Sequence, residues 1–143
     1  MNKRESPATP LLVTAAIIEQ DGKFLITQRP AHKPHPCMWE FPGGKLEAGE
    51  SPQQALKREL REELAVEINV GVICEVVYHL YDWGPVLILA YHCSWVYGEI
   101  QHLDIADHRW VTASEMLHIP LLPADKPIIE RLQTQLFQAS EQK

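Results

Sequence analysis

The segment from Gly44 to Val66, GKLEAGESPQQALKRELREELAV, places the strongest constraint on how this chain can fold. Ser51 is a favoured helix N-cap, Pro52 suits the first helical position, and Gln54 stands where a capping box has Glu or Gln. The leucines that follow recur at every fourth position and form one apolar stripe: Leu56, Leu60 and Leu64. At about 100° per residue such a stripe can face a core, so the segment predicts a loop followed by an amphipathic helix.

Beside the leucines, the same helix carries an acidic stripe formed by Glu59, Glu62 and Glu63. Like charges at these spacings repel each other by about a few tenths of a kcal/mol per pair. The helix dipole disfavours each anion near the C-terminus by roughly 0.3–1 kcal/mol, and Arg58 and Arg61 offset only part of this. One explanation is a solvated, charged helix face. The other is a site for a hard divalent cation such as Mg²⁺, Mn²⁺ or Ca²⁺, because these ions prefer carboxylate oxygens.

The order of residue types in this segment resembles the Nudix box. The pattern is Gly44, five residues, Glu50, seven residues, Arg58-Glu59-Leu60, one residue, Glu62-Glu63, one residue, a small residue and Val66. Ala65 stands where the family usually has glycine, which would serve a left-handed helix end. Alanine there either costs about 1 kcal/mol or shifts the helix terminus. The resemblance implies the Nudix fold, which is an α/β/α sandwich with a mixed β-sheet.

Composition and charge are those of an ordinary globular protein. With 143 residues, 45% of them hydrophobic and 22% charged, we expect a flexible tail over residues 1–9 and a single domain over residues 10–143. The net charge of −6 argues against binding to nucleic-acid polymers or anionic membranes, and no segment approaches transmembrane length. The three cysteines match neither a zinc pattern nor a disulfide framework, which favours the cytoplasm. Whether the protein is a monomer or a homodimer stays open.

Alternating apolar patterns bounded by turn residues predict strands at residues 11–18, 23–28, 67–81, 86–96 and 109–111. Asp21 and Gly22 should form the turn of the first hairpin, and Gly71 should interrupt the third strand. Thr112 and Glu115 form a second capping box that opens a short helix. A final helix over residues 126–139 should bury one apolar stripe: Ile128, Ile129, Leu132 and Leu136. This order of elements predicts an α+β sandwich with a mixed sheet between helices.

Outside the box, the segments EFPGGK and PADKP resemble MutT-type nucleoside triphosphate pyrophosphohydrolases. That resemblance implies Mg²⁺, with Mn²⁺ as an alternative, held by carboxylates and one backbone carbonyl: Glu59, Glu62, Glu63, Glu40 and the Gly43 carbonyl. Asp104 lies six residues before Trp110, where such proteins often have a Glu that contacts metal or water. It is either a further ligand or a plain surface residue. Glu50 and Arg58 are expected to form a salt bridge that holds the loop on the helix.

The same resemblance suggests residues that bind the nucleotide. Arg29 should contact the α-phosphate or the base, or else lie free on the surface, and Lys45 either meets a phosphate or is solvated. Trp83, together with Tyr81, could stack on the base or simply pack. Asp125 either caps the final helix or reads the edge of the base. If ionised it can only accept hydrogen bonds, and if protonated it can also donate one. His32 and His35 lie in a proline-rich loop that could cover substrate, and they are not expected to be ligands.

Three functions remain open from the sequence. The first is a Mg²⁺-dependent pyrophosphohydrolase that releases a nucleoside monophosphate and pyrophosphate, and that removes oxidised nucleotides such as 8-oxo-dGTP, with CTP or modified pyrimidine nucleotides as an alternative substrate. The second is a Nudix hydrolase of another nucleoside diphosphate derivative. The third is a non-catalytic nucleotide sensor, which would have no need of the acidic residues. The sequence chooses neither the base, nor the sugar, nor the general base.

Overall fold

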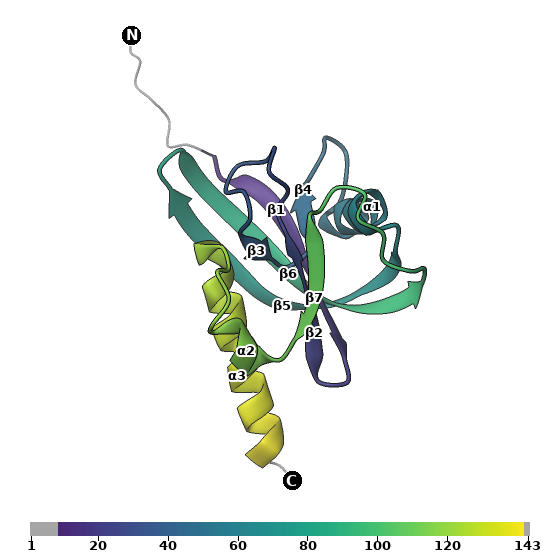
Figure 1. The fold of residues 1–143 in the computed structure, drawn as a ribbon. Coiled ribbons are helices and arrows are strands. Elements are labelled where there is room, and N and C mark those ends of the chain that lie inside the picture. The colour runs from purple at the N-terminus through teal and green to yellow at the C-terminus, as the bar shows by residue number, and fades with distance from the viewer. Residues whose placement is uncertain (1–8, 142–143) are drawn as a thin grey trace.

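The computed structural model describes residues 9–141, and Figure 1 shows how their helices and strands are arranged. The chain forms these elements in order: β1 (Leu11–Gln20), β2 (Lys23–Gln28), β3 (Trp39–Glu40), β4 (Gly43–Lys45), α1 (Pro52–Leu64), β5 (Glu67–Tyr81), β6 (Gly84–Tyr97), β7 (Asp107–Val111), α2 (Ala113–Met116), a 3-10 turn η1 (Pro123–Asp125) and α3 (Lys126–Glu141). No helix in the described part is long and apolar enough to cross a membrane. The predicted tail lies outside the described residues, except for Thr9.

The strands form one mixed sheet with β1 near its centre. The main order is β3-β2-β1-β6-β5, with β4 paired to β1 and β7 paired to β2. β1 runs parallel to β6, whereas the other pairs are antiparallel. The first half of β1 pairs with β4 and its last two residues pair with β2. β1 therefore has different neighbours along its length: β4 beside its first half and β2 beside its end. Because β4 pairs with β1, the loop that leads from β4 to α1 starts beside the central strand.

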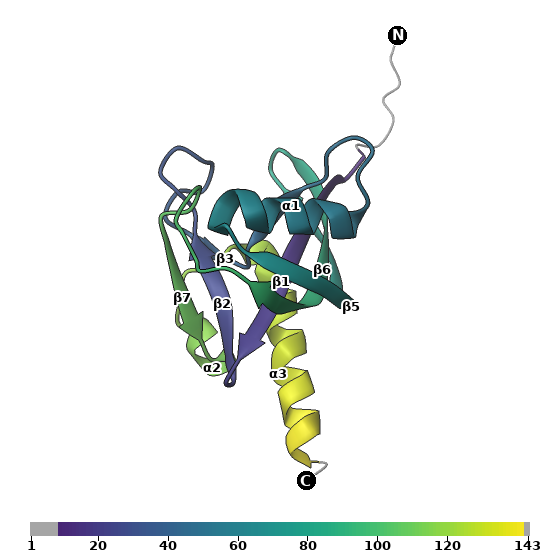
Figure 2. The same ribbon diagram turned by 90° about the vertical axis from the view of Figure 1, so that its right-hand side faces the viewer.

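Two helices cover opposite sides of this sheet, as Figures 1 and 2 show for α1 and α3. β1 divides its side chains between two cores, because successive strand residues point to opposite faces. Ala15 and Ile17 lie in the core under α3, and Ala16 and Ile18 lie in the core under α1. The prediction of an α+β sandwich with a mixed sheet is therefore confirmed.

The ends of α1 form as the sequence predicts. The Ser51 side chain accepts a hydrogen bond from the Gln54 backbone, and the Gln54 side chain accepts one from the Ser51 backbone. All three leucines of the predicted stripe are fully buried. Ala65 adopts the left-handed conformation, with φ 62° and ψ 35°. The missing glycine therefore does not shift the helix terminus, and the chain accepts the strain of a non-glycine residue there.

Several local predictions need correction. The two short strands β3 and β4 had no sequence signal, because runs of two and three residues are too short for a period-two pattern. β5 is continuous through Gly71, where the pairing with β6 shifts register between Val70 and Ile73 instead of breaking. The prediction that α3 buries Leu136 is wrong, because 44% of the Leu136 surface is exposed.

Candidate active site

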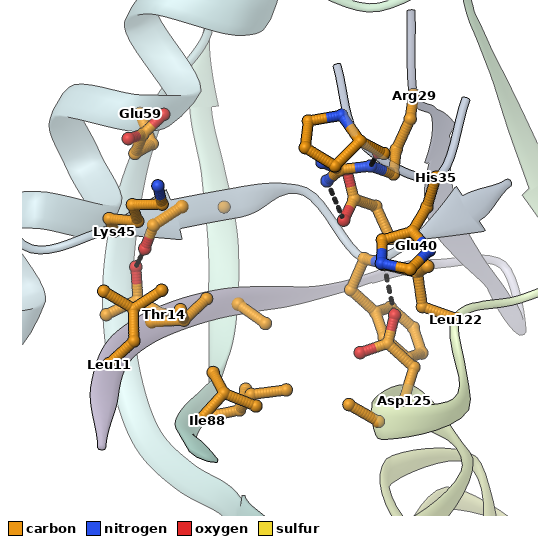
Figure 3. A pocket seen from close by; sticks show the side chains of 18 of the residues that line it. Leu11, Thr14, Arg29, His35, Glu40, Lys45, Glu59, Ile88, Leu122 and Asp125 are labelled. Carbon is orange, nitrogen blue, oxygen red and sulfur yellow. Dashed lines mark hydrogen bonds and ion pairs between the residues drawn. The ribbon is translucent and has the colours of Figure 1, made fainter. Parts of the chain in front are cut away.

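A pocket of about 810 Å³ lies between the first half of β1, the loop after β2, α1 and the turn η1. Figure 3 shows Glu59 of α1 and Lys45 at one end and Asp125 at the other, with Arg29 and Glu40 beside the Asp125 end. We call the part around Glu59 and Glu63 the acidic end and the part around Asp125 the aromatic end. Leu11 of β1 and Val86 and Ile88 of β6 add apolar side chains to the pocket lining.

The double glycine makes room for the acidic end. A Cβ atom on Gly44 would lie 2.4 Å from the Glu59 carboxyl carbon, so the Glu59 carboxylate rests directly on the Gly44 backbone. A Cβ atom on Gly43 would lie 2.0 Å from the Thr14 carbonyl oxygen of β1. The Thr14 hydroxyl also donates a hydrogen bond of 3.1 Å to the Gly44 carbonyl. The glycines therefore serve close packing between β1, β4 and α1, and they leave the Gly43 backbone at the pocket wall.

Arg58 ties the loop to the helix. Its guanidinium donates two hydrogen bonds to Glu50, of 2.6 and 3.0 Å, and one of 3.0 Å to the Lys45 carbonyl. Its remaining nitrogen lies 3.2 Å from a Glu59 oxygen and 3.1 Å from a Glu62 oxygen. The hydrogen bonds from Arg58, together with one from the Glu47 backbone, hold the pKa of Glu50 below its usual value. The expected pair between Glu50 and Arg58 is thus present and fixes the loop on α1.

The three glutamates of the acidic stripe have different environments. Glu59 and Glu63 line the pocket, whereas Glu62 does not, and 58% of the Glu62 side chain is exposed. Burial, and then the charge of Glu59, raises the pKa of Glu63 to about 9. Burial also raises the pKa of Glu59, although Arg58 opposes the shift. Carboxylates that are buried together without enough positive charge are poorly stabilised as anions, which is the situation that a bound divalent cation corrects.

A lysine that the sequence analysis did not single out already supplies part of this positive charge. The Lys33 ammonium lies 2.8 Å from Asp104 and 3.7 Å from Glu63. Burial lowers the pKa of Lys33, but its hydrogen bond to Asp104 and the charge of Glu63 outweigh burial and raise it overall. Asp104 does not line the pocket, yet its backbone N–H donates to the Glu63 carbonyl, and its carboxylate also lies 3.4 Å from His32. A cation thus bridges two of the predicted metal ligands.

Arg29 and Glu40 form an ion pair inside the pocket. One terminal nitrogen of Arg29 lies 3.0 and 3.1 Å from the two Glu40 oxygens, and the Arg29 Nε donates to the Pro34 carbonyl. Burial raises the pKa of Glu40, and Arg29 opposes that shift. The pair brings the end of β2 against β3, and it places one predicted substrate contact beside one predicted metal ligand, next to the aromatic end of the pocket.

The aromatic end is built around Asp125, which is 5% exposed. Its carboxylate accepts a hydrogen bond of 3.3 Å from the Phe41 backbone N–H, so it contacts the segment before β4 and points away from α3 (Figure 3). Burial, and then the charge of Glu40, raises the pKa of Asp125 well above its usual value. A helix cap would instead accept from the first turn of α3. The geometry therefore favours a pocket residue over the helix-cap interpretation.

Two aromatic rings form a wall at this end. Tyr81 and Trp83 stack with centroids 5.5 Å apart and planes inclined by 8°, and both line the pocket. Trp83 is 61% exposed, so one face of the stack is accessible. His35 lies 5.6 Å from the Tyr81 ring and also lines the pocket. The proline-rich loop thus covers part of the aromatic end, whereas His32 lies over Asp104 near the acidic end.

The pocket collects most of the predicted residues. Nine of those predicted for catalysis, metal or substrate line it or hold its wall: Arg29, Glu40, Gly43, Lys45, Glu59, Glu63, Trp83 and Asp125 line it, and Arg58 holds its wall. Glu50 supports the loop from outside, and Glu62 and Asp104 lie beside the pocket. The sequence analysis missed Lys33, Phe41 and Leu122, which line the pocket. A lone lysine in a loop and two isolated apolar residues have no spacing signal that could have identified them.

Known proteins with similar sequences show which family this chain belongs to. The model of the NUDIX domain matches residues 9–132. A CTP pyrophosphohydrolase of Escherichia coli is 42% identical over 118 residues, which are 82% of this chain and 87% of that protein. An 8-oxo-dGTP diphosphatase of Haemophilus influenzae is 49% identical over 125 residues, which are 84% of this chain and 89% of that protein.

A solved structure agrees with both sequence comparisons. The solution structure of the Escherichia coli ORF135 protein superposes with a TM-score of 0.76 at 39% identity, covering 87% of this chain and 89% of that one. Members of the family act on phosphoric anhydride bonds of nucleotide derivatives and generally use divalent metal ions. With the family model matched over most of the chain and the acidic helix beside a nucleotide-sized pocket, this protein belongs to the Nudix hydrolase family.

Proposed function

We propose that this protein is a Mg²⁺-dependent nucleoside triphosphate pyrophosphohydrolase that acts on oxidised guanine nucleotides such as 8-oxo-dGTP. The observation that supports this most is the division of one pocket into two chemically different ends. Buried carboxylates gather at the acidic end, whereas stacked rings and a buried carboxyl group form the other. A volume of about 810 Å³ lies within the range of sites for small ligands, and the two ends suit a triphosphate and a base.

The acidic end fits a divalent cation by its donor set. Glu59 and Glu63, with the Gly43 carbonyl and Glu40 nearby, offer the oxygen atoms that Mg²⁺ prefers. The Lys33 ammonium lies beside Glu63 and supplies positive charge where a Mg²⁺ ion would. Bound Mg²⁺ neutralises phosphate charge and makes a bound water more acidic. In the reaction, the oxygen of water bonds to a phosphorus of the diphosphate link and the bridging P–O bond breaks. The products are a nucleoside monophosphate and pyrophosphate.

The cationic side chains of the pocket have separate roles in this proposal. Lys45 lies at the acidic end and can bind phosphate oxygens there. Lys33 exchanges its contact with Glu63 for a phosphate oxygen when a cation takes over the neutralisation of Glu63. Arg29 lies nearer the base and faces the α-phosphate, while its pair with Glu40 keeps it in place. These positive charges orient the polyphosphate so that the scissile bond lies over the carboxylates.

At the aromatic end, Asp125 reads the base as a neutral carboxyl group. Burial raises the pKa of Asp125 well above its usual value, which favours the protonated form, and a protonated carboxyl group presents one donor and one acceptor in place of two acceptors. That pair matches the O6 acceptor and the N7–H donor of 8-oxoguanine, because oxidation turns the N7 acceptor of guanine into a donor. Tyr81 and Trp83 supply the stacking surface for the ring.

A second substrate class is supported by one relative and by the same carboxyl group. The relative that is 42% identical is a CTP pyrophosphohydrolase. The N3 acceptor and N4 donor of cytosine also match a protonated Asp125. CTP and its modified forms are therefore the alternative substrates of this site.

The test is a pyrophosphate-release screen with Mg²⁺ across normal, oxidised and methylated nucleotides. A nucleoside diphosphate sugar is assayed in parallel for release of nucleoside monophosphate, because its hydrolysis yields no pyrophosphate. We expect pyrophosphate release to be fastest with 8-oxo-dGTP or, under the alternative, with CTP or its modified forms. Glu63→Gln protein serves as the blank for contaminating phosphatases. Turnover of only the diphosphate sugar, or no turnover of any triphosphate, would overturn the proposal.

A further inference from the structure

Outside the pocket, two histidines and an aspartate meet on the surface of β7. His102 Nε2 and His108 Nδ1 lie 2.8 Å apart, and their rings are 5.1 Å apart between centroids. One ring nitrogen of each histidine and one carboxylate oxygen of Asp107 all lie within 4.8 Å of one another. Two imidazole nitrogens and one carboxylate oxygen are thus close enough together to bind one ion after a small adjustment.

The backbone around this group is fixed on both sides. The Gln101 N–H donates to the Leu64 carbonyl at the end of α1, and the Ala106 N–H donates to the Gln28 carbonyl of β2. The His108 backbone N–H donates a hydrogen bond of 2.8 Å to a carboxylate oxygen of Asp107, and this bond fixes the position of that carboxylate. A site whose ligands are held in place in this way needs little rearrangement when it binds a ligand.

The donor set distinguishes this group from the acidic end of the pocket. Hard ions such as Mg²⁺ favour oxygen donors, whereas imidazole suits Zn²⁺, Ni²⁺, Cu²⁺ and Co²⁺. Two imidazole nitrogens on one tetrahedral Zn²⁺ would lie about 3.3 Å apart, from Zn–N distances of about 2.0–2.1 Å. The 2.8 Å separation in this structure therefore needs only a small opening of the two rings.

We propose that His102, Asp107 and His108 form a second metal site, which takes a transition ion such as Zn²⁺ and is distinct from the Mg²⁺ site of α1. Two imidazoles and one carboxylate leave a position for water, and both His102 and Asp107 are exposed to solvent. The bound ion would link His102, in the loop before β7, to Asp107 and His108 of β7.

The location gives this ion a structural consequence. His102 and Asp107 flank Asp104, which contacts Lys33 and whose backbone N–H donates to the Glu63 carbonyl. A metal across His102 and Asp107 fixes the ends of the segment that lies against the acidic end of the pocket. Bound Zn²⁺ should therefore raise the melting temperature and slow the local opening of residues 101–106.

The experiment is a Zn²⁺ titration of the untagged full-length protein by calorimetry, with Mg²⁺ in excess to hold the carboxylates of α1. We expect one Zn²⁺ per chain. His102→Ala and His108→Ala should each weaken binding by about tenfold or more, because losing a ligand should cost at least as much as losing an outer partner. His118→Ala removes an exposed histidine elsewhere and should bind Zn²⁺ as the unaltered protein does. Asp107→Asn, which keeps the hydrogen bond to His108, tests the carboxylate without removing that contact.

Two results would overturn the second site. One is that the unaltered protein binds no Zn²⁺ in excess Mg²⁺, which would leave His102 and His108 as a hydrogen-bonded pair only. The other is that Zn²⁺ binding survives both histidine changes or is lost in Glu63→Gln, which would place the ion at α1. Because the readout is binding and melting temperature, the result does not depend on which nucleotide the enzyme hydrolyses.

Discussion

The two ends of the pocket are assembled in different ways. The glycines and carboxylates of the acidic end come from one continuous segment, since Gly43 and Gly44 lie in β4 and Glu59 and Glu63 lie in α1. The aromatic end joins residues from three separate parts of the chain: Phe41, the pair Tyr81 and Trp83, and the pair Leu122 and Asp125. Residues that hold a metal need fixed mutual spacing, which a helix provides, whereas residues that contact a base only need to surround it. Bond cleavage and base selection should therefore respond to different substitutions.

The largest effect is expected at the acidic end. Glu63→Gln removes a charge that should hold Mg²⁺ against the substrate, so kcat/KM should fall by about a hundredfold or more for every nucleotide, because metal ions supply several kcal/mol of charge stabilisation. The melting temperature should not fall, since burial already disfavours the Glu63 anion. Glu130→Gln, on the exposed side of α3, is the matched control. Equal activity in the two variants would remove Glu63 from the metal site.

Glu62→Gln refines the same comparison inside the acidic stripe. Glu62 remains a predicted metal ligand, yet its side chain is 58% exposed and pairs with Arg58. If Glu62 acts only through Arg58, its replacement should lower activity less than Glu63→Gln does under the same Mg²⁺ concentration. A loss as large as that of Glu63→Gln would instead support direct metal binding by Glu62.

A smaller loss is expected from Gly44→Ala, which adds one methyl group beneath a carboxylate. The new Cβ would lie 2.4 Å from the Glu59 carboxyl carbon, so Glu59 must move. Because a displacement of about 1 Å in a catalytic group can cost up to about a hundredfold in rate, we expect a loss below that limit and below the loss in Glu63→Gln. If the effect passes through Glu59, adding Gly44→Ala to Glu59→Gln should lower activity little further. Additive losses in kcat would show that Gly44 acts on another part of the site.

These two ends also explain what the sequence could and could not predict. The capping box, the leucine stripe and the acidic stripe follow the helix period, so α1 and its site residues were readable from Ser51 to Leu64. The sequence pattern identifies Asp125, but whether it caps α3 or lines the pocket depends on its hydrogen bond with the Phe41 backbone, 84 residues away. Lys33 has no local pattern, and only the fold brings it to Glu63. Long-range contacts of single residues leave no periodic signal.

The smallest effect concerns stability at the aromatic end. Because burial raises the pKa of Asp125 well above its value in the unfolded chain, the folded protein holds a proton that the unfolded chain releases above about pH 4. Asp125 therefore destabilises the fold increasingly as pH rises, until the pH reaches the folded pKa. Asp125→Asn cannot ionise. Its stability relative to the unaltered protein should therefore increase from pH 5 to pH 8, by at most about 1.4 kcal/mol per pH unit.

Melting curves of Asp125→Asn and the unaltered protein between pH 5 and pH 8 measure this difference. Asn can still accept the hydrogen bond from the Phe41 N–H, so that contact is matched in the two proteins. A constant difference in melting temperature over this range would mean that Asp125 ionises normally in the folded state.

The separation of cleavage from selection is tested most directly by kcat/KM for 8-oxo-dGTP, dGTP, CTP and dCTP with the unaltered protein, Glu63→Gln and Asp125→Ala. Glu63→Gln should lower all four values by a similar factor and keep their order. Asp125→Ala should change the ratio between preferred and poor substrates by about tenfold, the effect of about 1–3 kcal/mol of lost base contacts. If Asp125→Ala lowered all four values equally, or Glu63→Gln changed their order, the two ends of the pocket would not have separate functions.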